Sequence, residues 1–408
     1  MRNPSLVENP SVPLSHYSFL EVQQAFFSYA YQYCRPVAAW RLPHQSQQHL
    51  IADLSGSGYL PALPLELLPA GFIAHPFQEK AEAAFIRADV HYTSEAEATS
   101  WTEELDRSAR EALSTIESHL AAVQQQQTPY AVSSVPVEAD TERTQFVEVV
   151  AEAVAAIEAG HFHKVVPSRQ KLIALPSRFD VATAFQQLCD AYPAAFVSVF
   201  SIPGVGTWLG ASPEILVSTY QQAGRPIFRT MALAGTQVAR GQNALKHASW
   251  RQKEIEEQAM VSRYIIYCFK QIRLREFEEN GPKTVAAGNL LHLQTDFTVD
   301  MEATNFSNLG STMLSLLHPT SAVCGMPKEP AADFLRKHEP YDRSFFSGYL
   351  GPVNVREEAH LFVNLRCMQL LNQQALLYAG AGVTADSEPE KEWRETEMKM
   401  NTLLRVIT

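Results

Sequence analysis

Apolar positions recur at helical spacing along several long segments of the chain, and shorter runs rich in β-branched and aromatic residues lie between them. The helical pattern covers residues 22–34, 100–123, 143–162, 179–192, 244–277 and the chain from about 388 onward. The shorter runs predict strands at residues 70–77, 164–166, 195–202, 207–212, 214–220, 227–236, 360–371 and 374–383. Because the strands cluster rather than alternate strictly with helices, we expect a layered α+β fold with antiparallel sheets and helices packed outside them.

One stretch interrupts this pattern. Residues 124–141 contain a run of glutamines, two prolines and no apolar periodicity, so we expect an exposed connection there. It either separates two domains or forms a long loop within one. The candidate chemistry lies mainly after it, in residues 142–408, whereas residues 1–123 combine helix and strand signals.

Composition narrows the possible classes of protein. The net charge of the 408-residue chain is -11, without long blocks of like charge, which argues against a nucleic acid or an anionic membrane as a partner. The five cysteines are far apart and form no CxxC pair, so neither a disulfide framework nor a structural zinc site is indicated. The sequence shows no signal-like or membrane-spanning apolar run, and we expect a cytoplasmic protein.

Lys164 is an unusual residue for its place in the pattern. It stands at the start of a predicted buried strand, directly before Val165 and Val166. A lysine here either reaches solvent at the end of the strand or is held inside for a chemical reason. The local sequence leaves both interpretations open.

Two predicted helices carry glutamates on faces that continue as apolar stripes. Glu254 and Glu257 precede such a stripe in the helix at 244–277, and Glu392 and Glu395 share a face of the closing helix. Either pair alone is compatible with a solvated helix end. If the pairs meet across a cleft, a cation is needed to offset their repulsion, and an all-oxygen site favours Mg²⁺ over zinc.

Gly380 and Gly382 bound a short segment after the last predicted strand. Such a segment could present bare backbone N–H groups to an anion. The glycine spacing matches neither a dinucleotide fingerprint nor a P-loop, so nucleotide binding is not expected.

These features belong to a series of motifs whose order resembles that of the chorismate-utilising enzymes, and within them the isochorismate synthases. The motifs are "KVVPSR" with Lys164, "GASPE" ending at Glu214, "ALAGT" ending at Thr236, "KEIEEQ" with Glu254 and Glu257, "HPTSAVCGMPK" from His318, "RSFFSGYLG" from Arg343, "NLRCMQL" with Arg366, "AGAGV", and "EKEWRETEMK" ending at Lys399. The resemblance implies that residues 1–408 form one large chorismate-binding domain without an obligate glutaminase subunit, and we expect a monomer.

The resemblance also implies roles for single residues. Glu257 and Glu395 would bind Mg²⁺ directly, and Glu254 and Glu392 would support it through its waters. The substrate site would consist of Arg366, Lys399 and the backbone of Gly380 and Gly382, which hold the carboxylates of chorismate, together with Thr236, Ala322 and Phe346.

The implied reaction adds water at C2 of chorismate while the C4 hydroxyl leaves and a double bond moves, giving isochorismate. Lys164 would be the base that activates water, for which its pKa must be lowered, and Glu214 the acid that protonates the departing hydroxyl, for which its pKa must be raised. Ammonia-using relatives tend to carry glutamine where this chain has Lys164, and pyruvate-releasing relatives typically carry threonine where it has Ala322. Two alternatives are kept: an enzyme that eliminates pyruvate to give salicylate, and a protein that binds chorismate without converting it.

Three positions depart from the family pattern. Gln258 and Asn308 stand where many relatives have histidine, and Phe346 stands where tyrosine is common. An asparagine can form hydrogen bonds but cannot transfer a proton. We therefore expect these positions to bear on rate and product partition.

Overall fold

The structure is a computed structural model of the chain. It describes residues 17–56, 58, 63–94, 107–120, 127–133, 140–239, 244–287 and 290–407. Among these residues, no helix combines the length and the apolar character needed to cross a lipid bilayer.

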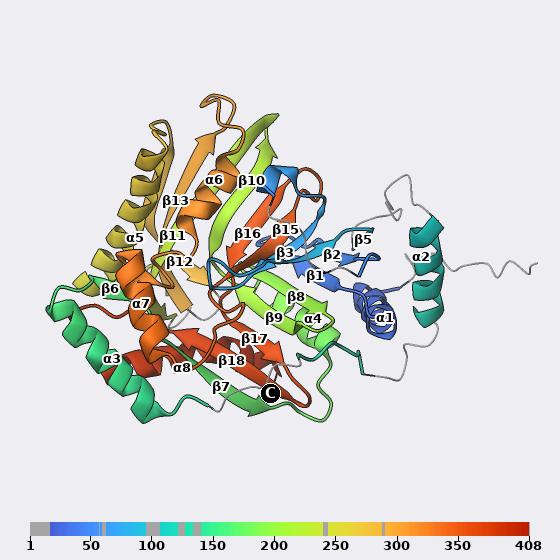
Figure 1. Cartoon of the computed structure of the whole chain (residues 1–408), viewed down its shortest axis with the longest axis horizontal. Helices are drawn as coiled ribbons and strands as arrows, with labels where there is room; N and C mark the ends of the chain where they lie inside the picture. Colours follow the sequence, from blue (N-terminus) through green and yellow to red (C-terminus); the bar gives the residue numbers. More distant parts are fainter. Residues whose placement is uncertain are drawn as a thin grey trace, which may run out of the picture.

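The first large sheet has eight antiparallel strands in the order β5-β2-β1-β8-β9-β17-β18-β7 (Figure 1). Its strands are β1 (Val37–Arg41), β2 (Gln48–Ala52), β5 (Val90–Thr93), β7 (Ser168–Ala174), β8 (Phe196–Ile202), β9 (Gly206–Ser212), β17 (Cys367–Leu370) and β18 (Gln374–Gly380). Strands from the beginning, middle and end of the chain therefore share one hydrogen-bonded layer, since β1 pairs with β8 and β17 pairs with β9.

The second large sheet follows the order β12-β13-β11-β10-β16-β15-β3-β4. Its strands are β3 (Gly71–His75), β4 (Ala84–Arg87), β10 (Ile215–Gln222), β11 (Arg225–Val238), β12 (Glu278–Ala287), β13 (Leu290–Asp300), β15 (Tyr349–Val353) and β16 (Ala359–Val363). A separate two-stranded sheet joins β6 (Lys164–Val165) to β14 (Gly325–Met326).

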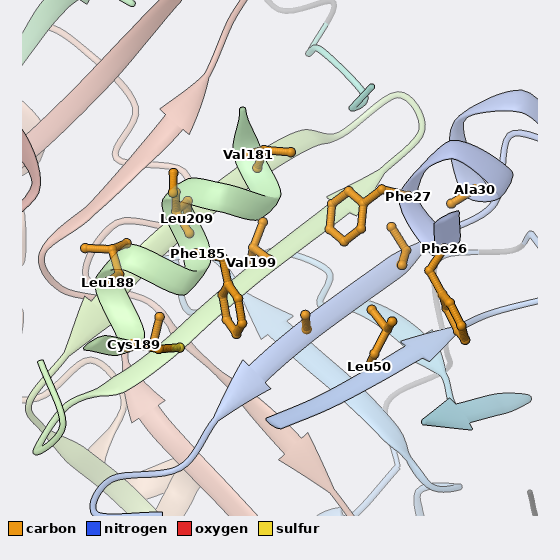
Figure 2. Packing of buried hydrophobic residues seen from close by; sticks show 14 of the residues in the cluster. Phe26, Phe27, Ala30, Leu50, Val181, Phe185, Leu188, Cys189, Val199 and Leu209 are labelled. Carbon is orange, nitrogen blue, oxygen red and sulfur yellow. The ribbon is translucent and has the colours of Figure 1, made fainter. Parts of the chain in front are cut away.

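The two large sheets pack on each other through aromatic side chains, and helices cover their outer faces. Phe196 of β8 stacks on Phe362 of β16 with ring centroids 4.1 Å apart, inside the core shared by both sheets. The helices outside the first sheet share an apolar core with it and are α1 (Phe19–Gln32), α2 (Arg107–Leu120), α4 (Val181–Ala191) and α8 (Pro389–Ile407); Figure 2 shows the part formed by α1 and α4. The second sheet is covered by α5 (Gln252–Gln271), α6 (Leu309–Leu317) and the 3-10 turn η2 (Leu65–Leu67). Two further helices, α3 (Arg143–Glu158) and α7 (Lys328–His338), pack around β6. The expected layered α+β fold with outer helices is confirmed.

Two predicted elements differ in extent from the observed ones. The long helix expected at 244–277 is the shorter α5, and the residues after it form β12 and β13, which the sequence analysis missed. The run at 360–371 is two strands, because Arg366 between them adopts a left-handed backbone with φ of 48°. That conformation is uncommon for a residue with a Cβ, and it ends β16 and starts β17 in the other sheet.

The connection expected at 124–141 is exposed at Gln127, Val132 and Asp140, but other parts of its described residues contact the first sheet. Thr128 is buried. The N–H of Ala131 donates to Oγ of Ser201 over 3.0 Å, and its carbonyl accepts from Oγ1 of Thr207 over 2.7 Å, so both backbone groups bond to the first sheet. Tyr130 donates to the carbonyl of Leu371 over 2.9 Å. These contacts hold residues 127–133 against the sheet; residues 124–126 and 134–139 lie outside the described residues.

Candidate active site

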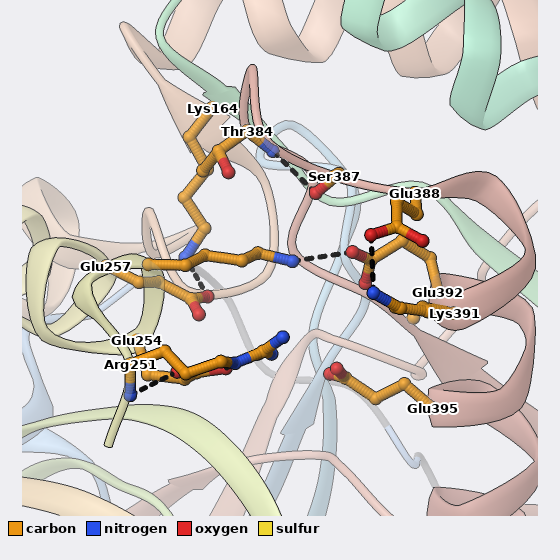
Figure 3. A network of polar contacts seen from close by, with 12 residues as sticks. Lys164, Arg251, Glu254, Glu257, Thr384, Ser387, Glu388, Lys391, Glu392 and Glu395 are labelled. Carbon is orange, nitrogen blue, oxygen red and sulfur yellow. Dashed lines mark hydrogen bonds and ion pairs between the residues drawn. The ribbon is translucent and has the colours of Figure 1, made fainter.

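Lys164 points into the molecule and not to solvent. Its strand β6 pairs with β14 on one side and contacts Val383 on the other through two backbone hydrogen bonds. The side chain is only 1% exposed, and Nζ lies 2.7 Å from Oε1 of Glu257 on α5 (Figure 3). Of the two interpretations that the sequence left open, the structure therefore supports the inward one.

Glu214 lies at the cavity wall between β9 and β10. It is 4% exposed, and its backbone carbonyl accepts a hydrogen bond from the N–H of Val363 over 3.0 Å. Burial raises the pKa of its carboxyl group to about 8, against the opposing effects of the charges on Lys164, Lys399 and Arg366. A glutamate with this pKa is largely protonated at neutral pH, which is the form a proton donor needs.

The two glutamate pairs face each other across one gap, as expected. Figure 3 shows Glu254 and Glu257 extending from α5 toward Glu392 and Glu395 of α8. Burial and the neighbouring carboxylate of Glu395 raise the pKa of Glu392. Like charges brought together in a partly buried place disfavour ionisation, so the gap is a place that attracts cations.

Each of these glutamates contacts a basic side chain of the chain itself. Beside the contact between Lys164 and Glu257, the ion pairs are Arg251 with Glu254, Lys253 Nζ with Glu392 Oε1 at 2.5 Å, and Lys399 Nζ with Glu395 Oε1 at 2.8 Å. The pair between Lys253 and Glu392 joins α5 to α8 directly. Glu254 also accepts a hydrogen bond from the N–H of Arg251 over 2.9 Å and thereby caps the start of α5.

The glutamates fit Mg²⁺ by the kind of ligand they offer, because carboxylate oxygens are what this ion binds in proteins. In the part of the chain that the structure describes, no three acidic, histidine or cysteine side chains converge closely enough to coordinate an ion together. The charges of the carboxylates are balanced by Lys164, Arg251, Lys253 and Lys399. A metal ion held by Glu257 and Glu395 would share these carboxylates with Lys164 and Lys399 or displace the lysines from them.

Gly382 leaves room for the contact between Lys164 and Glu257. A Cβ atom at this position would lie 2.5 Å from Oε1 of Glu257 and 3.2 Å from Cε of Lys164. The first distance is well below van der Waals contact, so a side chain here would displace the carboxylate.

Part of the segment expected to present backbone N–H groups is engaged by the fold, and binding of an anion by the backbone of Gly380 and Gly382, which line the cavity, stays a prediction. Gly380 is the last residue of β18 and pairs with Ser168, and its carbonyl accepts a hydrogen bond from Nζ of Lys399 over 2.9 Å. The N–H of Ala381 donates to the carbonyl of Pro167 over 3.1 Å. The amide between the two glycines is thus used by the fold, and the basic side chains supply the positive charge for an anion.

Arg366 is oriented by a histidine that the sequence analysis did not select. One Nη of Arg366 lies 2.5 Å from Nε2 of His292, and Nδ1 of His292 lies 2.7 Å from the carbonyl of Gly235. Because a carbonyl can only accept, Nδ1 carries the proton and Nε2 accepts from the guanidinium. Burial and the charge of Arg366 lower the pKa of His292 to about 3, so the ring is neutral.

One cavity brings most of the predicted residues together. Its walls contain ten of them, namely Glu214, Thr236, Glu257, Ala322, Phe346, Arg366, Gly380, Gly382, Glu395 and Lys399. An adjoining pocket, which shares Thr236, Glu257 and Glu395 with it, reaches Glu254 and Glu392. The cavity also contains His292, Arg343, Ser347 and Tyr378, to which the sequence analysis gave no role.

Asn308, given as the position where relatives carry a histidine before leucine, lies away from the cavity. Asn308 is exposed at the start of α6 and does not line the cavity. A His-Leu sequence does occur at the cavity, as His292 and Leu293 of β13. This pair was the available signal, and it was missed because the strand that carries it was not predicted.

Gln258 does not line the cavity either. It is buried behind Glu257, where its amide nitrogen donates to the carbonyl of Ala232 over 3.2 Å and to Oγ1 of Thr295 over 3.0 Å. Its role is to join α5 to the second sheet.

Comparison with known proteins gives consistent matches over most of the chain. A model of the family "Chorismate binding enzyme" matches residues 74–408. The chain is 29% identical over 271 residues to the isochorismate synthase EntC of Escherichia coli K12, covering 65% of this chain and 68% of EntC. It is 31% identical over 281 residues to the salicylate biosynthesis isochorismate synthase of Pseudomonas aeruginosa, covering 65% of this chain and 55% of that protein.

Solved structures share the whole architecture. The menaquinone-specific isochorismate synthase MenF from Escherichia coli matches with a TM-score of 0.73 at 19% identity, covering 97% of this chain and 93% of MenF. Anthranilate synthase component I from Streptococcus pneumoniae matches with a TM-score of 0.65 at 16% identity, covering 90% of both chains. At these identities the structural matches establish the fold.

Proposed function

Because this chain belongs to the chorismate-binding enzyme family, we propose that it is an isochorismate synthase, an isomerase that converts chorismate to isochorismate. One observation supports the proposal most. A buried lysine and a buried glutamate with a raised pKa stand beside one cavity whose walls include Arg366 and Lys399. The relatives named isochorismate synthases support the same activity.

In the proposed reaction the two carboxylates of chorismate bind near Arg366 and Lys399, which the hydrogen bonds to His292 and Gly380 orient. Lys164, as the neutral amine, takes a proton from water as the oxygen bonds to C2. Both ring double bonds shift toward C4 as the C4–O bond breaks, and Glu214 gives its proton to the departing hydroxyl, which leaves as water. One water is consumed and one released, and proton exchange with solvent restores both side chains.

Mg²⁺ is part of the proposal, with Glu257 and Glu395 as ligands and with Glu254 and Glu392 supporting its waters. Bound there, the ion would supply positive charge that orients a substrate carboxylate. Glu257 also contacts the proposed base, so a cation at Glu257 competes with Lys164 for the same carboxylate.

The deciding experiment incubates the protein with chorismate and Mg²⁺ and assays isochorismate, pyruvate and salicylate. We expect isochorismate without added glutaminase subunit. Stoichiometric release of pyruvate would instead identify a pyruvate-eliminating enzyme. Binding of chorismate that depends on Mg²⁺, without any product, would identify a binding protein.

The proposed roles are tested by three variants. Lys164→Ala and Glu214→Gln should each lower turnover by about 10²-fold or more while the fold remains, because each removes a proton-transfer group. Glu257→Ala should abolish the dependence of activity on Mg²⁺ and weaken binding of the ion, measured by calorimetry without substrate. Lys171→Ala, which removes a half-buried lysine on β7 outside the cavity, is the control.

A further inference from the structure

Arg343 lines the cavity and has no role in the proposed reaction. It is 2% exposed, and its guanidinium lies over the ring of Phe77 at 4.4 Å from the centroid. A buried arginine needs a counter-charge and acceptors for its N–H groups, since an unpaired buried charge is strongly unfavourable. The groups that provide this counter-charge and these acceptors identify the segments that Arg343 holds together.

The counter-charge is Glu339, four residues earlier. Nε of Arg343 donates to Oε2 of Glu339 over 2.7 Å, and one Nη donates to the other carboxylate oxygen, which makes the pair bidentate. Such a fork fixes the plane of both groups as well as their distance. Glu339 also accepts from the N–H and the hydroxyl of Ser168, over 2.7 and 2.9 Å.

The remaining hydrogen bonds of Arg343 go to the main chain of the cavity wall. One Nη donates to the carbonyl of Val166 over 2.7 Å, and the other donates to the carbonyl of Val323 over 2.9 Å. Both valines line the cavity. Val166 lies two residues after Lys164, and Val323 lies directly after Ala322, so the guanidinium joins the strand of the proposed base to the neighbouring wall.

The same pair also fixes the end of the strand that follows the base. Ser168, which Glu339 binds, is the first residue of β7. With Val166 bound to Arg343 and Ser168 bound to Glu339, the chain after Lys164 is held at both residues that flank Pro167. Proline cannot donate a hydrogen bond, so these two attachments add to the backbone hydrogen bonds that this segment makes with Cys324 and Ala381.

We propose that Arg343 and Glu339 are positioning residues for the reaction, which hold the strand of Lys164 and the wall at Val323 in register with the bound substrate. This inference rests on the proposed isochorismate synthase activity. Arg343 acts through the main chain of Val166 and Val323, and the side chains that contact substrate are others. Misplacing a reacting group by about 1 Å can cost about 10²-fold in rate, so the pair is expected to act mainly on kcat.

The test compares Arg343→Lys with the parent protein under saturating Mg²⁺. Lysine keeps the charge, but its single nitrogen cannot bind the carboxylate and both carbonyls in a fork. We expect kcat for isochorismate formation to fall about 10²-fold while KM stays near the parent value, because Arg366 and Lys399 remain. Glu339→Gln keeps the shape of its side chain and should lower kcat in the same direction.

Arg41→Lys is the matched control. Arg41 is also a buried arginine, and it donates to the main-chain carbonyls of Leu42, Tyr192, Pro193 and Ala195, away from the cavity walls. Its replacement should lower thermal stability with kcat unchanged at temperatures well below unfolding. A purely structural role for Arg343 predicts the same behaviour for Arg343→Lys.

The results distinguish a failure of this inference from a failure of the proposed function. Parental kcat in folded Arg343→Lys, or a loss of activity that merely follows the unfolded fraction, would overturn the inference. If that variant does not fold, Glu339→Gln decides the question by the same two readouts. Failure of the parent protein to form isochorismate would refute the proposed function itself, and it is seen before any variant is compared.

Discussion

At the scale of single residues, burial decides what Glu214 can do. A carboxyl group loses the solvation of its charged form when it is buried, and near Glu214 this effect exceeds the attraction of three basic side chains. The result is an acid with a pKa of about 8 in a cavity that also contains basic side chains. The same residue on the surface could not hold a proton at neutral pH.

The pH dependence of activity follows from this shift. Glu214 is protonated below its pKa of about 8 and ionised above it, so the proton donor is lost as the pH rises. We expect kcat/KM to be maintained toward neutral pH and to fall about tenfold per pH unit above pH 8, measured between pH 6.5 and 9.5. Because burial raises this pKa from its ordinary value of 4.5 to about 8, the stability of the fold falls as the pH rises between these two values, where the folded state holds a proton that the unfolded state has lost.

A second prediction concerns Gly382. Gly382→Ala places a methyl group 2.5 Å from the present position of Oε1 of Glu257, so the carboxylate must move away from Lys164. We expect activity to fall by about 10²-fold and Mg²⁺ affinity to fall with it, because one group serves both contacts. Steady-state kinetics and calorimetry with Mg²⁺ measure the two effects, and parental values in both would contradict the assigned geometry.

At the scale of elements, the site depends on how the N-terminal ends of α5 and α8 lie relative to each other. Each helix contributes two glutamates to the gap between them, and the ion pair of Lys253 with Glu392 crosses that gap. Glu392 is 3% exposed at its side chain, so its charge needs this partner or a metal ion.

Lys253→Met should therefore destabilise the protein when divalent ions are removed. Glu392 then loses its partner while Glu395 still repels it, and we expect the free energy of unfolding to fall by about 1–3 kcal/mol. Urea unfolding in the presence of a chelator measures this. Lys391→Met is the control, because its ion pair with Glu388 is more than half exposed on both sides and should contribute far less to stability. Equal effects of the two substitutions would argue against a special role of the pair across the gap.

At the scale of the whole molecule, the N-terminal third is a part of both sheets. Strands β1, β2 and β5 continue the first sheet beyond β8, and β3 and β4 continue the second beyond β15. The aromatic core between the sheets includes Trp40 and Phe72 from this part of the chain. The residues that carry the chemistry therefore share their core with residues 1–123.

Deletion of residues 1–123 should prevent folding of the remainder. It would expose the edges of β8 and β15 and one side of the core, and exposed strand edges favour aggregation. We expect residues 124–408 to show no cooperative thermal transition in circular dichroism and to elute as aggregates in size-exclusion chromatography. A monomeric, cooperatively folded fragment would show that the N-terminal part is a separable domain.

Local patterns in the sequence determined a good part of the secondary structure and of the candidate site. Helical periodicity predicted α1, α3, α4 and α8, and alternation and apolar runs predicted most strands after residue 195. The spacing of the glutamates put Glu254 with Glu257, and Glu392 with Glu395, on shared helix faces. These are properties of neighbouring residues, which the chain carries without its tertiary structure. The order of motifs added the family, which the match over residues 74–408 confirms.

Tertiary structure alone decided the rest, because the contacts involved join residues far apart in sequence. Whether Lys164 reaches solvent depends on Glu257 and Gly382, which belong to other elements. The left-handed backbone of Arg366 and its bond to His292 depend on strands of different sheets meeting at the cavity. Burial, which raises the pKa of Glu214 and lowers that of His292, is a property of the packed molecule and of no local pattern.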